Sequence, residues 1–182
     1  TSNGMGTNVF NGCSKLESVS IKTSNLLFST VFDGVNSIKD VTFNYTGEIP
    51  ANSCKDITSL TNVTISNTIT SIGNYAFDGC TNLQNPTIPN SITNIGENAF
   101  KDCETFTSFT IQNSITSVGT NPFIGCVGLT TVVINNDSVV CSTVFSGADN
   151  INTITFDYDG GMPADSCKDI TSLTNVTISN TI

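Results

Sequence analysis

One aromatic or thiol position returns along the whole chain every 22 or 23 residues, and no other feature constrains the fold as strongly. We call this position the anchor and number the repeating units 1 to 8 by it. The eight anchors are Phe10, Phe32, Cys54, Phe77, Phe100, Phe123, Phe145 and Cys167. A fixed period of this length is typical of solenoids, in which each unit is one supersecondary element stacked on the next.

Four further columns keep a fixed distance from the anchor and are apolar, with Pro86 as the one irregular member. They lie five residues before the anchor and six, nine and eleven residues after it, and in unit 3 they are Ile49, Leu60, Val63 and Ile65. Because positions nine and eleven alternate with polar neighbours, they predict a short β-strand. Position six completes the L-x-x-L-x-L spacing of a leucine-rich repeat strand.

Each unit has one apolar side that it cannot bury alone, so the units must stack to form a continuous core. We therefore predict a leucine-rich repeat solenoid that forms a single domain over residues 1–182. It is a curved array of about eight units with a parallel β-sheet on the concave face and short helical or irregular turns on the convex face. We expect Leu60, Val63 and Ile65 to be among its deepest residues, and Leu83→Ala to cost on the order of 2–5 kcal/mol.

A second period appears in Ser53–Ile69 and Ser166–Ile182, which have the same sequence 113 residues, or five units, apart. The second copy stops within a unit, and we interpret the chain as a fragment of a longer array. Solenoid ends usually carry a polar cap, and Ser166–Ile182 is an interior sequence without one. We expect its edge strand to fray or to pair with another molecule, which makes edge-to-edge self-association possible. The same holds for Met5–Phe10 at the other end.

Three segments resemble the BspA-like, or Treponema pallidum type, class of bacterial and protozoan leucine-rich repeats. They are Thr68–Leu83, Ile88–Cys103 and Ser114–Cys126, and they share a phenylalanine anchor followed three residues later by cysteine. The Ile-Gly or Val-Gly step that precedes the anchor there is missing from the units anchored by Phe32, Cys54, Phe145 and Cys167. The resemblance implies a secreted or cell-surface protein that adheres to host matrix, host cells or other microbes.

Charge narrows the range of partners and activities. The chain has six Lys and Arg residues against 15 Asp and Glu residues, no His, and a net charge of -9 at pH 7. Nucleic acids and anionic membrane surfaces bind basic patches, so we expect neither as a partner. The chain has no run of about 18 apolar residues, which predicts no membrane insertion within it.

We predict no enzymatic activity, no catalytic residues and no cofactor. Without His, the triads that depend on it are excluded. Paired catalytic carboxylates need a pocket, whereas the acidic residues recur on the convex turns and indicate a solvated face. These acidic residues are Asp33, Asp56, Asp78, Asp102 and Asp169.

The cysteines follow the repeat, and we predict six of them to be buried structural thiols. They are Cys13, Cys54, Cys80, Cys103, Cys126 and Cys167. Disulfides between stacked units remain an alternative, although the geometry that they require is narrow. The sequence contains no C-x-x-C pair and no His, which argues against a zinc site.

The acidic run at Asp157, Asp159 and Asp165 is too short for an EF-hand calcium loop. We interpret it as a solvated turn and predict no metal site. The strongest candidate for binding is instead the concave face, where outward side chains are mostly hydroxyls and amides. Such a face lacks the aromatic and Arg anchors of tight interfaces, so it favours weak contacts multiplied by repetition. The candidate ligand-binding residues are Lys39, Asp40, Asn62, Gln84, Asn85, Thr107, Ser108, Thr131, Thr153 and Asn175.

The sequence therefore predicts a cell-surface or secreted binding module, with adhesion to an extracellular protein or glycan as its function. An architectural spacer without its own ligand is an alternative, because the concave face is fairly uniform. An ice-binding solenoid is a remote alternative, suggested by the outward threonine column that includes Thr42, Thr64 and Thr87. Threonine also suits strands by β-propensity alone.

Overall fold

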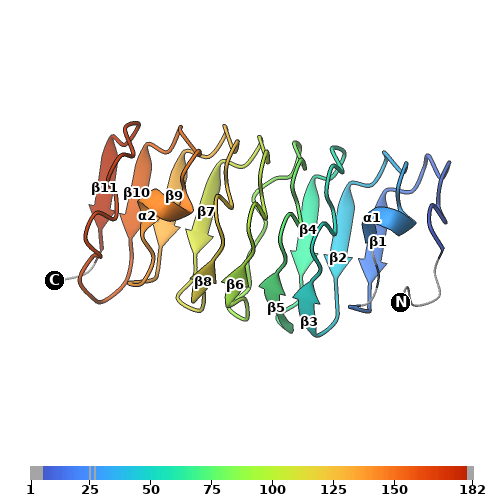
Figure 1. Cartoon of the computed structure of the whole chain (residues 1–182), viewed down its shortest axis with the longest axis horizontal. Helices are drawn as coiled ribbons and strands as arrows, with labels where there is room; N and C mark the ends of the chain where they lie inside the picture. The colour runs from blue at the N-terminus through green and yellow to red at the C-terminus, as the bar shows by residue number, and fades with distance from the viewer. Residues whose placement is uncertain (1–5, 25, 27, 180–182) are drawn as a thin grey trace.

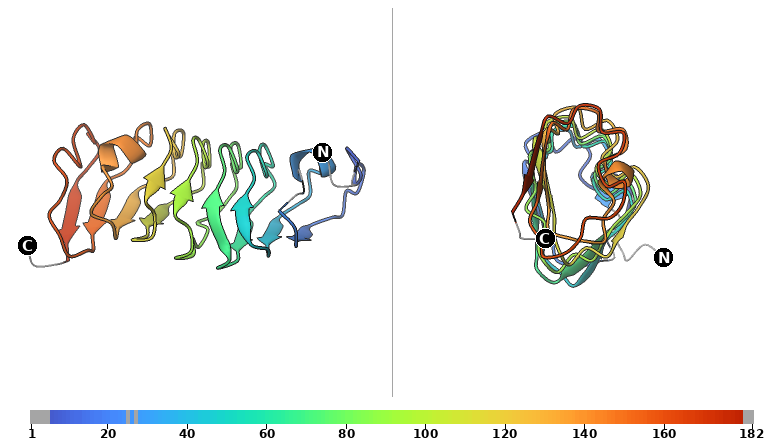
Figure 2. Two further views of the ribbon diagram at one scale, coloured as in Figure 1. Left: turned by 60° about the horizontal axis from the view of Figure 1, so that its bottom comes forward. Right: turned by 90° about the vertical axis from the view of Figure 1, so that its left-hand side faces the viewer.

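The chain folds into an elongated solenoid whose turns stack along the long axis (Figure 1). The structure is a computed structural model that describes residues 6–24, 26 and 28–179. Viewed along the axis, successive turns superpose around a common interior (Figure 2). The predicted leucine-rich repeat solenoid with a parallel sheet is confirmed.

The strands that follow position six form one wall of the solenoid and are paired in parallel. They are β1 (Ser18–Ile21), β2 (Asp40–Phe43) and β4 (Asn62–Ile65) in one sheet, and β7 (Ser108–Ile111), β9 (Thr131–Ile134), β10 (Thr153–Phe156) and β11 (Asn175–Ile178) in the other. The register stacks equal repeat positions on each other, as with Val41 opposite Val63 and Ile154 opposite Val176. We call the outward surface of these two sheets the sheet face.

The two sheets are separated at unit 4, where Pro86 and Pro89 replace residues that have an N–H group. In unit 3 the position of Pro89 is Ser66, whose N–H donates to the carbonyl of Phe43 at 3.0 Å. Asn85 compensates in part, because its Oδ1 accepts hydrogen bonds from the N–H groups of Thr107 and Ser108 at 2.9 and 3.2 Å. We call this interruption the seam.

The seam also explains an error in the predicted core. Leu60 and Leu83 are fully buried, as expected, whereas Val63 and Ile65 in β4 remain 8% and 9% exposed. They are buried but are not among the deepest residues. The strand that the apolar columns predict in unit 4 is absent from the described part of the chain, so β4 has a strand partner on one side only.

A second wall carries a shorter parallel sheet that the sequence analysis does not predict (Figure 2). Its strands are β3 (Gly47–Ile49), β5 (Ile69–Ile72), β6 (Asn94–Ile95) and β8 (Ser117–Val118). The Ile-Gly step lies at the end of this sheet, where neighbouring turns pass at close range. A Cβ atom on Gly96 would lie 2.6 Å from the nitrogen of Asn74, so only glycine fits.

The third wall, which we call the helix wall, lies opposite the main sheets and carries the anchors (Figure 2). It contains the two short helices α1 (Phe28–Val31) and α2 (Cys141–Val144), while the turns between them are irregular. The anchor rings stack inside it, with centroids 5.3 Å apart for Phe77 and Phe100 and 5.6 Å apart for Phe100 and Phe123. Anchors are buried in units 2 to 7, whereas Phe10 and Cys167 in the outermost units are partly exposed.

The column five residues before the anchor is less uniform than expected. It is fully buried at Ile49, Ile72 and Ile95, but Met162 is 46% exposed. Two further members of this column, Met5 and Leu27, lie outside the described residues.

Candidate functional site

The sheet face begins with a charged cluster in units 1 to 3. The ammonium group of Lys39 lies 2.8 Å from Oε1 of Glu17, and both side chains are more than half exposed. The hydrogen bond to Glu17 raises the pKa of Lys39. Beside this pair, the amide of Asn62 donates to Oδ1 of Asp40 at 2.8 Å. The structure therefore places the predicted residues Asp40 and Asn62 on adjacent strands, with Lys39 directly before β2.

Beyond the seam the sheet face is a ladder of hydroxyl and amide groups. The amide of Asn85 donates to the hydroxyls of Thr107 and Ser108 at 2.9 and 3.1 Å. The sheet register then places Ser108 opposite Thr131 and Thr131 opposite Thr153. Thr153 in turn lies opposite Asn175. Equal positions of successive units thus form a continuous polar row.

Gln84 differs from the other candidate amides. Its side chain is exposed, and it makes no side-chain hydrogen bond among the described residues. Gln84 lies beside Asn85 at the seam, and the side-chain amide of Asn85 is hydrogen-bonded to Thr107 and Ser108. Of the four candidate amides, Gln84 is therefore the one without a side-chain hydrogen bond to another described residue.

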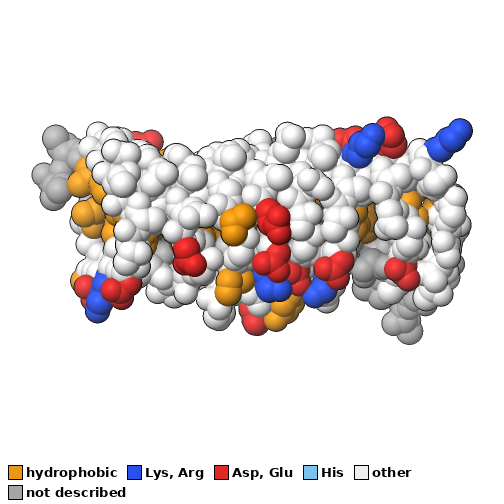
Figure 3. Space-filling model, turned by 90° about the horizontal axis from the view of Figure 1, so that it is seen from above, with side chains coloured by type: hydrophobic (Ala, Val, Ile, Leu, Met, Phe, Trp, Pro, Cys, Tyr) orange, Lys and Arg blue, Asp and Glu red, His pale blue; other side chains and the backbone are white. Residues whose placement is uncertain are grey.

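Much of the molecular surface is neither charged nor apolar. In Figure 3, charged side chains gather near the edges and in one central group, and most of the visible surface between them belongs to other residues or to the backbone. Neutral hydroxyls and amides offer short-range hydrogen bonds but no long-range electrostatic attraction. Such a surface suits many weak contacts along an extended partner.

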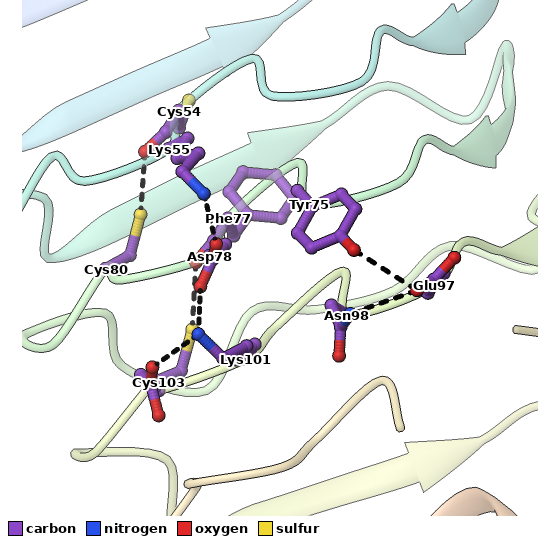
Figure 4. A network of polar contacts seen from close by, with 11 residues as sticks. Cys54, Lys55, Tyr75, Phe77, Asp78, Cys80, Glu97, Asn98, Lys101 and Cys103 are labelled. Atoms are coloured by element: carbon purple, nitrogen blue, oxygen red, sulfur yellow. Dashed lines mark hydrogen bonds and ion pairs between the residues drawn. The ribbon is translucent and has the colours of Figure 1, made fainter. Parts of the chain in front are cut away.

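A different polar network lies on the helix wall, and it corrects one prediction (Figure 4). Asp78 is buried instead of solvated, because its carboxylate lies between the ammonium groups of Lys55 at 2.7 Å and Lys101 at 3.4 Å. The hydrogen bond to Asp78 raises the pKa of Lys55, and the one to Asp102 raises the pKa of Lys101. The sequence signal was the alternation of charge in the column one residue after the anchor.

Three other acidic residues of the convex turns occupy positions where the backbone has a positive φ angle. Asp56, Asp102 and Asp169 have φ angles of 61°, 56° and 62°, and the equivalent positions in units 4 and 6 are Gly79 and Gly125. Asp tolerates this left-handed conformation better than most residues with a Cβ atom. Their spacing along the chain therefore has a structural cause.

The cysteines are free thiols at all seven positions. Cys80, Cys103 and Cys126 each donate to an anchor carbonyl of the preceding unit, at 3.0, 3.3 and 3.0 Å. Burial raises the pKa of Cys126 to about 12. Cys54 is buried as well.

Two cysteine predictions require correction. Cys13 is exposed and Cys167 is only partly buried. Both lie in outermost units, where no described turn packs on the outer side. Burial of the repeat position therefore depends on a neighbour that these two units lack.

Neither a metal centre nor a membrane-spanning helix is found in the described ranges. No three His, Cys, Asp or Glu side chains within residues 6–24, 26 and 28–179 are grouped so that they could hold a metal ion. In the same ranges no helix has the length and apolar character to cross a bilayer.

Comparison with known proteins identifies the repeat family and solved structures with a similar fold. The profile of the BspA type leucine rich repeat region matches residues 1–83 and 47–162, with six copies. A leucine-rich repeat protein from Treponema pallidum is 18% identical, with a TM-score of 0.57, over 93% of this chain and 75% of that one. One from Bacteroides ovatus is 17% identical, with a TM-score of 0.54, over 95% of this chain and 63% of that one.

A third solved structure, the pneumococcal vaccine antigen PcpA, is 14% identical with a TM-score of 0.58. The match covers 92% of this chain and 42% of the antigen. This chain thus spans less than two thirds of the Bacteroides ovatus protein and of the antigen. No curated protein matches it. At these identities the solved structures support the fold.

Proposed function

Because the chain belongs to the BspA-type leucine-rich repeat family, we propose that it is a surface-displayed or secreted binding module that mediates adhesion. The sheet face is the binding surface, and an extended extracellular protein is the partner. A glycan chain is the other partner that the same chemistry suits. The observation that carries the proposal is the in-register polar row that continues over β7, β9, β10 and β11.

The row determines how binding works. Each unit presents the same few uncharged groups, so an extended partner meets a repeated set of hydrogen-bonding positions. No single position has the aromatic or Arg anchor of an interface hot spot. Affinity therefore grows with the number of units engaged, as in multivalent binding.

The test compares two sets of residues that are exposed or partly exposed. Asn62, Gln84 and Thr131 on the sheet face are replaced together by Ala, and the control replaces Thr58, Thr81 and Glu104 on the turns after the anchor. Attachment is measured by surface plasmon resonance on immobilised matrix proteins, with the melting temperature of each variant as the measure of folding. We expect the first variant to attach at least tenfold more weakly than the parent chain. The control variant should attach as strongly as the parent chain. Equal attachment by both variants contradicts the placement of the binding face.

An architectural spacer is the second candidate function, and one observation favours it. The amides of Asn62 and Asn85 already donate to Asp40, Thr107 and Ser108 on neighbouring strands. Such bonds stabilise the array and leave fewer donors for a partner. A spacer shows no saturable attachment to any immobilised protein, whereas an adhesive module does.

A further inference from the structure

Backbone hydrogen bonds hold neighbouring turns together on the helix wall. In units 3 to 6 the N–H two residues after each anchor donates to a carbonyl of the next turn. Asp56 donates to Asp78 at 2.7 Å, and Gly79 donates to Lys101 at 2.9 Å. The accepting carbonyl lies directly after the next anchor in units 3 to 5 and one residue further on in unit 6, where Gly125 donates to Gly147 at 3.1 Å. Adjacent turns therefore lie in contact along this wall.

The two short helices interrupt this pattern. In unit 2 the anchor N–H of Phe32 donates within its own turn to Phe28 at 3.0 Å, and in unit 7 Phe145 donates to Cys141 at 2.8 Å. The equivalent anchor N–H in unit 3, that of Cys54, donates to Ala76 in the next turn. In the two units with a helix, the anchor N–H therefore bonds within its own turn, whereas in unit 3 it bonds to the next turn.

Among the described residues, units 2 and 7 also lack the bond that the N–H two residues after the anchor donates to the next turn in units 3 to 6. In the described part of the chain, neither the N–H of Gly34 nor the carbonyl of Lys55 has a hydrogen-bond partner. The same holds for the N–H of Gly147 and the carbonyl of Lys168. These are the donor and acceptor that the pattern of the interior turns would join.

A cleft opens at each of these two positions. The first has a volume of about 290 Å³ between units 2 and 3, and the second about 410 Å³ between units 7 and 8. The first is lined by Phe32, Gly34, Asn36, Lys55, Asp56 and Ile57, among others. The residue 113 positions after each of these six lines the second cleft, and five of the six are identical. The longer sequence period therefore repeats a cleft.

The lining selects a class of ligand. Each cleft combines an unpaired N–H and an unpaired carbonyl with one Lys and two Asp residues, which are Asp33 and Asp56 in the first cleft. Phe32 and Ile57 contribute apolar surface next to these groups. Carboxylates and carbonyls accept hydrogen bonds, and an N–H donates one. A ligand with many hydroxyl groups and apolar C–H faces satisfies both kinds of surface.

Other classes of ligand fit less well. An anion meets two carboxylates and one ammonium group in each cleft, in a protein with a net charge of -9. Both volumes lie at or near the lower end of the range of about 300–1,000 Å³ for small-molecule sites, so the ligand is small. We propose that each cleft binds one or two neutral sugar units, with a hydroxyl placed between the glycine N–H and the lysine carbonyl.

The test blocks each cleft at an exposed position that makes no side-chain hydrogen bond among the described residues. Asn36→Trp fills the first cleft and Asp149→Trp fills the second. Glu104→Trp is the matched control, because Glu104 occupies the same repeat position in unit 5, where Asp102 keeps its backbone bond to Ile124 of the next turn at 2.8 Å. The probes are glucose, galactose, mannose, N-acetylglucosamine, maltose and lactose. Binding is followed by saturation-transfer NMR and its stoichiometry by calorimetry.

We expect at least one of these sugars to bind at two sites on the parent chain and on the Glu104→Trp variant. Each cleft variant should retain one site, and the double variant none. Absence of binding by all six sugars, or binding that survives in the double variant, overturns the proposal. The clefts lie on the helix wall, so replacing Asn62, Gln84 and Thr131 on the sheet face should leave sugar binding unchanged. That result separates this inference from the proposed adhesive function.

Discussion

The same 17 residues, Ser53–Ile69 and Ser166–Ile182, stand at two places in this solenoid and fold alike where the structure describes both. They form β4 in one unit and β11 in the other. The left-handed residue is Asp56 in one copy and Asp169 in the other, with φ angles of 61° and 62°. Local conformation therefore follows the sequence together with the turn that precedes it.

Burial separates the two copies. Val63 is 8% exposed and its equivalent Val176 is 51% exposed, while Ile65 is 9% exposed and Ile178 is 46% exposed. Unit 4 packs on the first copy, and no described turn packs on the second. The comparison shows that a strand of this array is shaped by its own sequence but buried by its neighbour.

The largest expected difference between the copies concerns leucine at position six. Leu60 is fully buried, whereas Leu173 is half-buried. Leu60→Ala should lower the free energy of unfolding by about 2–5 kcal/mol, because it leaves a cavity. Leu173→Ala should lower it by only about 1 kcal/mol, because less apolar surface is lost. Urea denaturation followed by circular dichroism measures both, and equal losses would contradict the comparison.

Thiol reactivity should differ nearly as much. Burial raises the pKa of Cys54 well above its usual value and raises that of Cys167 to a smaller extent. The thiolate is the reactive form, so a maleimide should label Cys167 at least 100 times faster than Cys54 at pH 8. Mass spectrometry of the labelled peptides at increasing times gives the two rates. The exposed Cys13 is the control for rapid labelling.

Covering the second copy should make it resemble the first. Extending the chain beyond Ile182 with the sequence of Thr70–Asn90 completes the last unit and places the strand positions of a further unit over Val176 and Ile178. Burial of their exposed halves should add about 1–3 kcal/mol of stability and slow amide exchange in β11. An extension of equal length made of Gly and Ser is the control. If both extensions protect β11 equally, the neighbour is not the cause of burial.

The smallest expected difference concerns lysine directly after the anchor. Lys55 pairs with the buried Asp78, whereas Lys168 forms no ion pair with any described residue. Lys55→Met should cost about 1 kcal/mol of stability and Lys168→Met less than about 0.5 kcal/mol, since the Lys55 side chain is 38% exposed. The pKa of Lys55 is raised, so its contribution is complete at pH 7. It is lost as the pH rises through that raised pKa, and thermal melts at pH 7 and 11 test this.

The sequence predicted the elements that depend on local pattern and stacking. The alternation around Val41 and Ile154 is sufficient to locate β2 and β10, because each strand has one buried face. The second sheet was missed because β3 has three residues and β6 and β8 only two, and because the buried residues of the four-residue β5 are its first and last, which do not alternate. Strands so short have no periodicity that separates them from turns.

The candidate site could be predicted only in part. Alternation indicates that Asn62 and Asn85 point outward, but not that Asp40 and Thr107 on neighbouring strands accept their hydrogen bonds. The buried Asp78 was missed because its partners lie 23 residues away on each side along the chain. Pairing across turns depends on the register, which single units do not reveal.

The seam at unit 4 makes the solenoid mechanically uneven. On the sheet side, unit 4 keeps a backbone bond from Gln84 to Thr61 of unit 3 at 3.0 Å and is joined to unit 5 through the side chains of Asn85 and Thr105. The helix wall keeps its backbone bonds to the following unit there, such as Phe77 to Ala99 at 2.8 Å. Bending is therefore easiest about unit 4, with the sheet side opening and the helix wall acting as the pivot. Such a joint changes the distance between the two halves of the sheet face, so a stiff partner longer than one half can be accommodated without breaking either sheet.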